Sequence, residues 1–167
     1  MLRTRLSASL STIMPHNVAT NRKARHEYEI LDKLEAGIVL TGTEVKSLRA
    51  GRCSIQEGFA VVRHGEAVLK GVHIAPYHQG SIHNVEPLRD RRLLLHRQEI
   101  RKLTTQLQER GRTLVPLRIY FSRGYAKVEL GLAKGRATYD KRQKLREDDA
   151  KRRTDEALKQ YSRGQNV

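Results

Sequence analysis

The sequence of 167 residues has little of several residue types that particular classes of protein require. It has one cysteine, Cys53, so it can form neither an internal disulfide nor a cysteine-based metal cluster. No apolar stretch approaches the roughly 20 residues that span a bilayer. Hydrophobic residues make up 38% of the chain, enough for one modest core. We therefore expect one domain with tails, in a reducing compartment and without a membrane-spanning segment.

The sequence also lacks the short motifs that mark common enzymes and metal sites. It contains no nucleophile elbow, no phosphate-binding P-loop and no His-Glu-x-x-His pattern. The seven histidines are scattered, and none is spaced with a cysteine or carboxylate as metal ligands are. Cys53 has no obvious base beside it, which favours a plain small residue over a nucleophile. We therefore predict no catalytic residues, no metal and no cofactor.

Positive charge is what the chain has in excess. Its formal net charge is +15, with a surplus of eight in residues 21–133 and of five in residues 134–167. A charge of this size favours nucleic acid or an anionic membrane as partner. Because neutralising phosphates releases counterions, binding to nucleic acid should weaken steeply with salt.

Composition divides the chain into three parts. Residues 1–16 carry no acidic residue. We expect them to be a disordered extension or an over-long gene start, and in the second case translation would begin at Met14. A transit peptide is the alternative. Residues 17–133 should form the folded domain. Residues 134–167 combine good helix propensity with few apolar side chains, which predicts a tail disordered in isolation and helical along an anionic surface.

Short strands and two helices are predicted within the folded part. The predicted strands cover residues 26–41 (broken near 36–37), 59–63, 67–74, 115–121 and 125–130. Thr41 and Glu44 form a capping-box pattern that starts a helix ending near Ala50, and a second helix covers residues 97–110. The strand over 115–121 should have one buried face, and it should turn at residues 122–124 (SRG) into the strand over 125–130 as a hairpin. The absence of a βαβ rhythm indicates a mainly β fold, a small antiparallel OB-like barrel with flanking helices.

Basic and planar side chains lie together in residues 21–28, sequence NRKARHEY. The basic groups are Arg22, Lys23 and Arg25, and the rings are His26 and Tyr28. Such a set can hold phosphates and stack on unpaired bases, although a solvated basic arm explains the spacing as well. Glu35 either accepts a hydrogen bond from a base edge or caps a turn.

Several runs together resemble one family, the small protein B family or SsrA-binding proteins. These runs are residues 21–28, 35–38 (EAGI), 42–51 (GTEVKSLRAG), 93–95 (LLL), and 131–135 (GLAKG) followed by 140–142 (DKR). The resemblance extends from about residue 17 to the C-terminus, and residues 1–13 have no counterpart. His96 stands where asparagine is frequent in the family, and Tyr139 where histidine is often found.

The resemblance implies an OB-like barrel that binds the tRNA-like domain of transfer-messenger RNA (SsrA). The family delivers this RNA to stalled ribosomes for trans-translation, and its C-terminal tail becomes a helix in the empty mRNA channel near the decoding centre. The RNA-binding positions would be Asn21, Arg22, Lys23, Arg25, His26, Glu35, Lys46, Arg49, Leu94 and Lys127. The ribosome-contacting positions would be Lys134, Gly135, Arg136, Tyr139, Asp140, Lys141 and Arg142. We expect a monomeric adaptor in the bacterial cytoplasm, with transfer-messenger RNA and the stalled ribosome as partners and no membrane partner.

Two other function classes compete with this interpretation. An OB-type ribosomal or initiation-factor-like protein would bind rRNA and use the tail only as a solvated anchor. An RNA-modifying enzyme would need a pocket with a positioned nucleophile, which the sequence does not offer.

Overall fold

The computed structural model describes residues 16–164, except for the side chains of residues 138–141, 144 and 160–164. Residues 1–15, and with them the predicted start at Met14, lie outside the described residues. The strands are β1 (His16–Thr20), β2 (Tyr28–Ile38), β3 (Cys53–Ser54), β4 (Phe59–Arg63), β5 (Glu66–Lys70), β6 (His73–Ile74), β7 (Arg91–Leu94), β8 (Arg112–Ser122) and β9 (Tyr125–Gly135). The helices are α1 (Arg22–Glu27), α2 (Gly42–Arg49), α3 (Arg97–Leu107) and α4 (Thr138–Gly164), with a 3-10 turn η1 (Ser81–His83).

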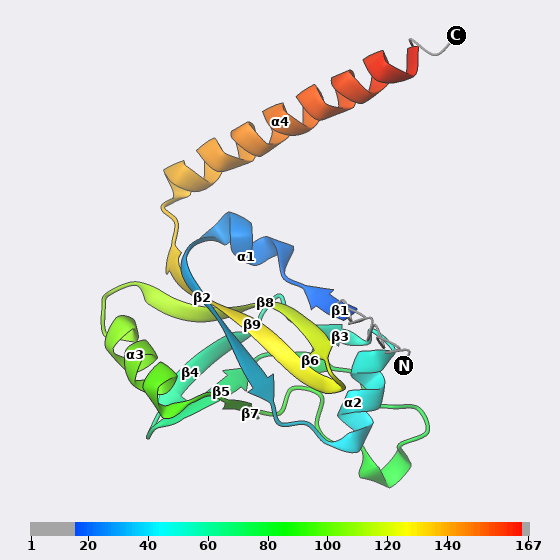
Figure 1. Ribbon diagram of the computed structural model, residues 1–167, viewed down its shortest axis with the longest axis vertical. Coiled ribbons are helices and arrows are strands. Elements are labelled where there is room, and N and C mark those ends of the chain that lie inside the picture. The colour runs from blue at the N-terminus through cyan, green and yellow to red at the C-terminus, as the bar shows by residue number, and fades with distance from the viewer. Residues whose placement is uncertain (1–15, 165–167) are drawn as a thin grey trace, which may run out of the picture.

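Six antiparallel strands form a closed ring, in the order β8–β4–β5–β7–β2–β9 and back to β8 (Figure 1). The β2–β9 and β8–β9 pairs are long, whereas β4 meets β8 through the single pair Ala60 and Leu114. Strand β1 pairs with the far end of β8, and β3 and β6 form a separate two-stranded sheet. Closure leaves few exposed sheet edges. The predicted mainly β antiparallel fold with flanking helices is confirmed.

The β8–β9 hairpin turns at Arg123 and Gly124, both with positive φ, as its sequence predicted. The prediction of one buried face for β8 is wrong. The strand register shifts between Pro116 and Arg118, and side chains on both faces are buried. Leu114 packs in the main core, whereas Leu117 packs in a second cluster beneath α1. Because a helix covers the outer face, β8 does not show the alternation of a half-exposed strand.

Helix α1 was not predicted, since residues 22–27 have no apolar period and residue 26 was assigned to a strand. The helix nevertheless begins after Asn21, whose Oδ1 accepts a hydrogen bond from the amide of Ala24 at 3.0 Å. Ala24 is its one buried residue. Strand β2 then runs without the predicted break near residues 36–37. Gly37 pairs with Leu94 of β7, and the position suits glycine because an added Cβ would lie only 3.3 Å from the Leu94 Cβ.

Helices α2 and α3 both begin with capping boxes, and that of α2 was predicted from its sequence. Glu44 accepts the amide of Thr41 at 2.9 Å, and Glu99 accepts the amide of His96 at 2.8 Å. Leu48 of α2 and Leu103 of α3 are buried in the main core. The two helices lie at opposite ends of the barrel (Figure 1).

The tail forms one helix, α4, that points away from the barrel (Figure 1). The helix agrees with the good helix propensity of these residues, and the disorder of the tail in isolation stays a prediction. Its described side chains are all exposed, and Arg152 pairs with Glu156 one turn away at 3.2 Å. Strong helix formers and such pairs stabilise a helix locally, by a few tenths of a kcal/mol per pair. No helix within residues 16–164 is both long enough and apolar enough to cross a membrane.

Candidate nucleic-acid interface

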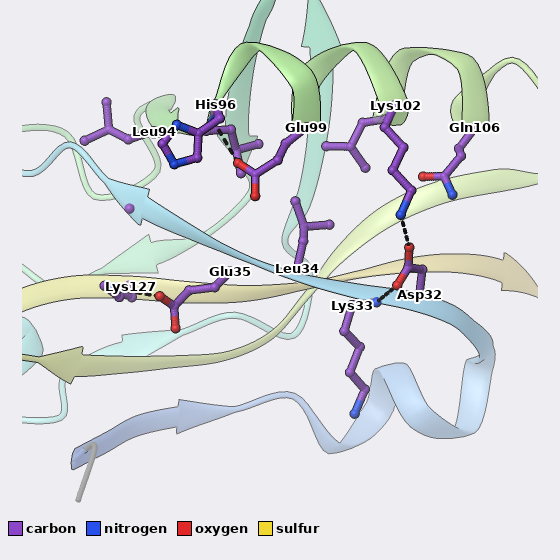
Figure 2. A pocket seen from close by; sticks show the side chains of 13 residues that line it. Asp32, Lys33, Leu34, Glu35, Leu94, His96, Glu99, Lys102, Gln106 and Lys127 are labelled. Atoms are coloured by element: carbon purple, nitrogen blue, oxygen red, sulfur yellow. Dashed lines mark hydrogen bonds and ion pairs between the residues drawn. The ribbon is translucent and has the colours of Figure 1, made fainter. Parts of the chain in front are cut away.

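A groove of about 680 Å³ separates strand β2 from helix α3 (Figure 2). Its apolar lining is formed by Leu34, Leu94, Leu95 and Leu103, and its polar lining includes Asp32, Lys33, Glu35, His96, Glu99, Lys102, Gln106 and Lys127. Leu94 is 57% exposed although it is large and apolar. A groove with an apolar wall and charges of both signs can receive a planar ring together with its phosphate.

Glu35 and Lys127 form an ion pair at the groove, with Glu35 on β2 and Lys127 on the neighbouring β9. One oxygen of Glu35 accepts from the Lys127 ammonium and the other from the Tyr120 hydroxyl on β8. These two hydrogen bonds hold the pKa of Glu35 below its ordinary value, against a smaller opposing effect of burial. The carboxylate is therefore ionised and faces the groove at neutral pH.

Asp32 and Lys102 form a second pair that sequence reasoning missed (Figure 2). The Lys102 ammonium of α3 donates to Asp32 of β2 at 3.0 Å, and the Lys33 amide donates to the same carboxylate at 2.8 Å. The hydrogen bond from Lys102 is the main reason that the pKa of Asp32 lies below its ordinary value. No sequence signal marks this pair, because its members are 70 residues apart and meet only through the packing of α3 against β2. The pair bridges the groove from wall to wall.

The basic residues predicted from the sequence lie on α1. Arg22, Lys23, Arg25 and His26 are all exposed. The Lys23 ammonium donates a hydrogen bond to Glu57 at 2.8 Å, and this bond raises the pKa of Lys23. Helix α1 packs on the outer face of β8 and β2, so its cations lie outside the groove.

Asn21 has a different environment from the other predicted RNA contacts. Its side chain is 2% exposed, and both ends of its carboxamide are used within the fold. The Nδ2 group donates to the carbonyls of Ile55 and Pro116 at 3.3 and 3.1 Å, while Oδ1 caps α1. The structure therefore makes Asn21 the residue that fixes the position of α1, with its side chain facing the protein.

Lys46 and Arg49 are exposed on α2, at the other end of the barrel from α3 (Figure 1). The Lys46 ammonium lies 5.3 Å from the centre of the Tyr77 ring, and the Arg49 guanidinium 5.3 Å from that of Phe121. Each cation is thus held over a ring. Neither residue lines the groove that holds Glu35, Leu94 and Lys127.

The predicted tail residues fall in two environments. Lys134 and Gly135 are the last residues of β9 and pair with β2, so the barrel extends beyond the predicted boundary at residue 133. The Arg136 amide donates to the Glu27 carbonyl at 3.0 Å. Tyr139, Asp140, Lys141 and Arg142 belong to the first turns of α4, and of these only the side chain of Arg142, which is exposed, is described.

Other chemistry has little support among the residues described. Residues 16–164 show no group of three or more His, Cys, Asp or Glu side chains that could hold a metal ion. Burial raises the pKa of the Cys53 thiol to about 11, so the reactive thiolate is scarce at neutral pH.

Comparison with known proteins places these features in a family. Residues 18–160 match the family model for SmpB protein. An SsrA-binding protein of Acetivibrio thermocellus is 56% identical over 146 residues, which is 87% of this chain and 95% of the relative. An SsrA-binding protein of Enterococcus hirae is 52% identical over the same share of each chain.

A solved structure described as "tmRNA-SmpB: a journey to the center of the bacterial ribosome" also matches. It is 55% identical with a TM-score of 0.62, and the match covers 72% of this chain and 85% of that one. The barrel, the groove and the exposed C-terminal helix described above are those of a protein that belongs to the SmpB family of SsrA-binding proteins.

Proposed function

We propose that this protein is the adaptor that binds the tRNA-like domain of transfer-messenger RNA and delivers it to stalled ribosomes. Trans-translation then tags the incomplete peptide. In this proposal the protein works in the bacterial cytoplasm as an RNA-binding protein without a catalytic step. Its relatives are described as SsrA-binding proteins, and its net charge of +15 suits an RNA partner.

The observation that carries the proposal is the gathering of Glu35, Leu94 and Lys127 around one groove. They come from three strands, β2, β7 and β9, and are far apart in the sequence. Leu94 offers an exposed apolar surface to a base, Glu35 accepts from a base edge, and Lys127 supplies charge for phosphate. The exposed cations of α1 extend this RNA-binding surface over the adjoining face.

The tail has a separate role in this proposal. Helix α4 leaves the barrel with its described side chains exposed, and residues 138–167 carry nine basic and six acidic residues. A helix of this kind can lie in an mRNA channel lined with rRNA phosphates when no mRNA fills it. An occupied channel excludes the helix sterically. The tail thereby senses an empty channel.

Removal of residues 138–167 tests this division of labour. The cut follows β9, so it leaves the β2–β9 pairing intact, which a cut after residue 133 would not. We expect affinity for transfer-messenger RNA to change less than about threefold, while tagging on stalled ribosomes is lost. Lys127→Ala is the reciprocal control, and we expect about a tenfold loss of RNA affinity because a hydrogen bond to a charged group contributes about 1.5–3 kcal/mol.

Two results would contradict the proposal. Equal loss of RNA affinity and tagging on truncation would show that the tail takes part in RNA capture. Tight binding to rRNA without preference for transfer-messenger RNA would instead favour a ribosomal or initiation-factor-like protein.

A further inference from the structure

Three strands bring charged side chains into one row beside the groove. In the β2–β9 register Glu35 lies opposite Glu129, and in the β8–β9 register Glu129 lies opposite Arg118. Two carboxylates directly opposite each other on neighbouring strands destabilise a sheet unless cations compensate them. The row therefore needs a cation for each carboxylate.

Each carboxylate has its own cation. Arg118 Nε donates to Glu129 Oε2 at 2.9 Å, and the Lys127 ammonium donates to Glu35. Tyr120 connects the two pairs. Its ring lies 4.9 Å from the Arg118 guanidinium, and its hydroxyl donates to the second oxygen of Glu35.

Tyr120 does not lie on the RNA-binding surface itself. It is 4% exposed, and it is not among the residues that line the groove. Glu35 and Lys127, in contrast, both line the groove and are partly exposed. The Tyr120 hydroxyl can therefore act on RNA binding through Glu35, the group to which it donates.

Hydrogen bonds to both oxygens restrict the rotation of the Glu35 carboxylate. A side chain that is already fixed in its binding geometry loses less conformational entropy when the ligand arrives. Without the Tyr120 hydroxyl, Glu35 would keep one strong partner and regain rotational freedom about its last torsion.

We propose that Tyr120 is a positioning residue for RNA capture, which fixes the Glu35 carboxylate, and through it the Lys127 ammonium, in the geometry that receives the RNA. This inference rests on the proposed function of the groove. The groups that face Glu35 are Tyr120 and Arg118 of β8, Lys127 and Glu129 of β9, and Glu99 and Lys102 across the groove on α3.

A double-mutant cycle on the full chain tests the proposal. Tyr120→Phe removes the hydroxyl and keeps the ring over Arg118. We expect it to weaken binding of transfer-messenger RNA about fivefold in the wild-type background, and by less than about twofold in the Glu35→Ala background. Tyr125→Phe removes a hydroxyl from the exposed hairpin turn, where the side chain is 74% exposed, and is expected to leave both affinities unchanged.

A measurement without RNA supports the cycle. The carboxyl carbon of Glu35, followed by NMR against pH, reports the ionisation of that group. In Tyr120→Phe we expect its titration midpoint to move upward, because a hydrogen bond to the ionised form is lost while Lys127 and Arg118 remain. Tyr125→Phe should leave the midpoint where it is.

The outcomes separate this inference from the proposed function. A fivefold loss from Tyr120→Phe that persists in the Glu35→Ala background overturns the inference alone, as does an unmoved Glu35 midpoint. Glu35→Ala with wild-type RNA affinity overturns the assignment of the groove, and the inference with it. Loss in the wild-type background only, with a shifted midpoint, supports both.

Discussion

Glu44 and Arg91 are buried charges that connect helix α2 to the start of β7. Glu44 is 3% exposed and Arg91 1% exposed, with Arg91 Nε 2.9 Å from Glu44 Oε1. Arg89 donates to both oxygens of the same carboxylate. Arg91 also donates to the carbonyls of Val72 and Pro87 at 2.6 and 2.9 Å. Every charged group of this cluster therefore has a partner, as burial requires.

Glu44→Ala should destabilise the protein strongly. The substitution leaves Arg91 buried without its counter-charge, and breaking a buried pair costs about 3–5 kcal/mol. Urea denaturation should show this fall in the free energy of unfolding. Glu57→Ala is the matched control, since Glu57 is 77% exposed in its pair with Lys23 and should change stability by less than about 1 kcal/mol. Equal effects of the two substitutions would contradict the role given to burial.

Acid should weaken the same cluster. Burial by itself raises the pKa of Glu44, but hydrogen bonds from Arg89 and Thr41 and the charge of Arg91 outweigh it and lower the pKa below 4.5. A carboxyl group whose pKa is lower in the folded than in the unfolded state stabilises the fold fully at pH values above its unfolded pKa. This stabilisation is lost as the pH falls through the pKa of the folded state. The difference in unfolding free energy between wild type and Glu44→Ala should therefore shrink between about pH 5 and pH 3. A constant difference over that range would contradict the assignment.

At the scale of elements, helix α1 depends on one residue before it. Asn21→Ala removes the cap and two further hydrogen bonds to the carbonyls of Ile55 and Pro116. We expect the free energy of unfolding to fall by about 2–3 kcal/mol, and the Ala24 amide to lose protection from hydrogen exchange. RNA affinity should fall because the cations of α1 are no longer held in place.

Asn21→Asp separates the two roles of the Asn21 side chain. Aspartate keeps the oxygen that caps α1 and loses the Nδ2 donor, so the Ala24 amide should stay protected while overall stability still falls. A variant Asn21→Ala with wild-type stability and reduced RNA affinity would show instead that this side chain contacts the RNA.

Elements with local sequence signals could be predicted, and those fixed by tertiary packing could not. The capping box at Thr41 and the turn at Arg123 and Gly124 depend on residues that are close together in the sequence. The second buried face of β8 arises because α1 packs there, and α1 itself has only Ala24 as a buried residue. No periodicity within residues 112–122 reveals a helix that comes from residues 22–27.

Helix α4 should melt independently of the barrel. Its described side chains are exposed, and its contact with α1 includes His26 Nδ1 at 3.4 Å from Asp148 Oδ2, both on half-exposed side chains. A helix with so little tertiary packing is marginally stable in water. The difference between the circular dichroism of the full chain and of a chain lacking residues 138–167 isolates this helix. We expect the difference signal to fall gradually on heating, well below the cooperative transition of the barrel. A difference signal that disappears in the same transition would show that the helix packs on the barrel.

At the scale of the whole molecule, the resemblance named three residues of the groove, and the structure shows how they come together. Glu35, Leu94 and Lys127 come together because β2 pairs with both β7 and β9. Lys46 and Arg49 were named beside them but lie on α2, outside the set of residues that line the groove. Tyr120, Asp32 and Lys102 were not foreseen, because their partners are set by strand register and by the packing of α3 on the sheet.

The salt dependence of binding tests which part of the molecule, the barrel or residues 138–167, supplies the cations that contact each RNA partner. When cations of a protein neutralise phosphates, the logarithm of the binding constant falls linearly with the logarithm of the salt concentration. The slope is about −0.7 to −0.9 for each phosphate contacted. Capture of transfer-messenger RNA is assigned to the barrel, so the full chain and the chain without residues 138–167 should show the same slope. Lys127→Ala should make that slope shallower by about 1 if its ammonium contacts a phosphate.

Binding to ribosomes with an empty mRNA channel should behave in the opposite way. There the truncated chain should have a clearly shallower slope than the full chain, because the nine basic residues of 138–167 are missing. Fluorescence anisotropy with labelled RNA and sedimentation with ribosomes, each at several salt concentrations, give the two slopes. If truncation instead reduces the slope for transfer-messenger RNA and leaves that for ribosomes unchanged, the tail belongs to RNA capture and the barrel to ribosome binding.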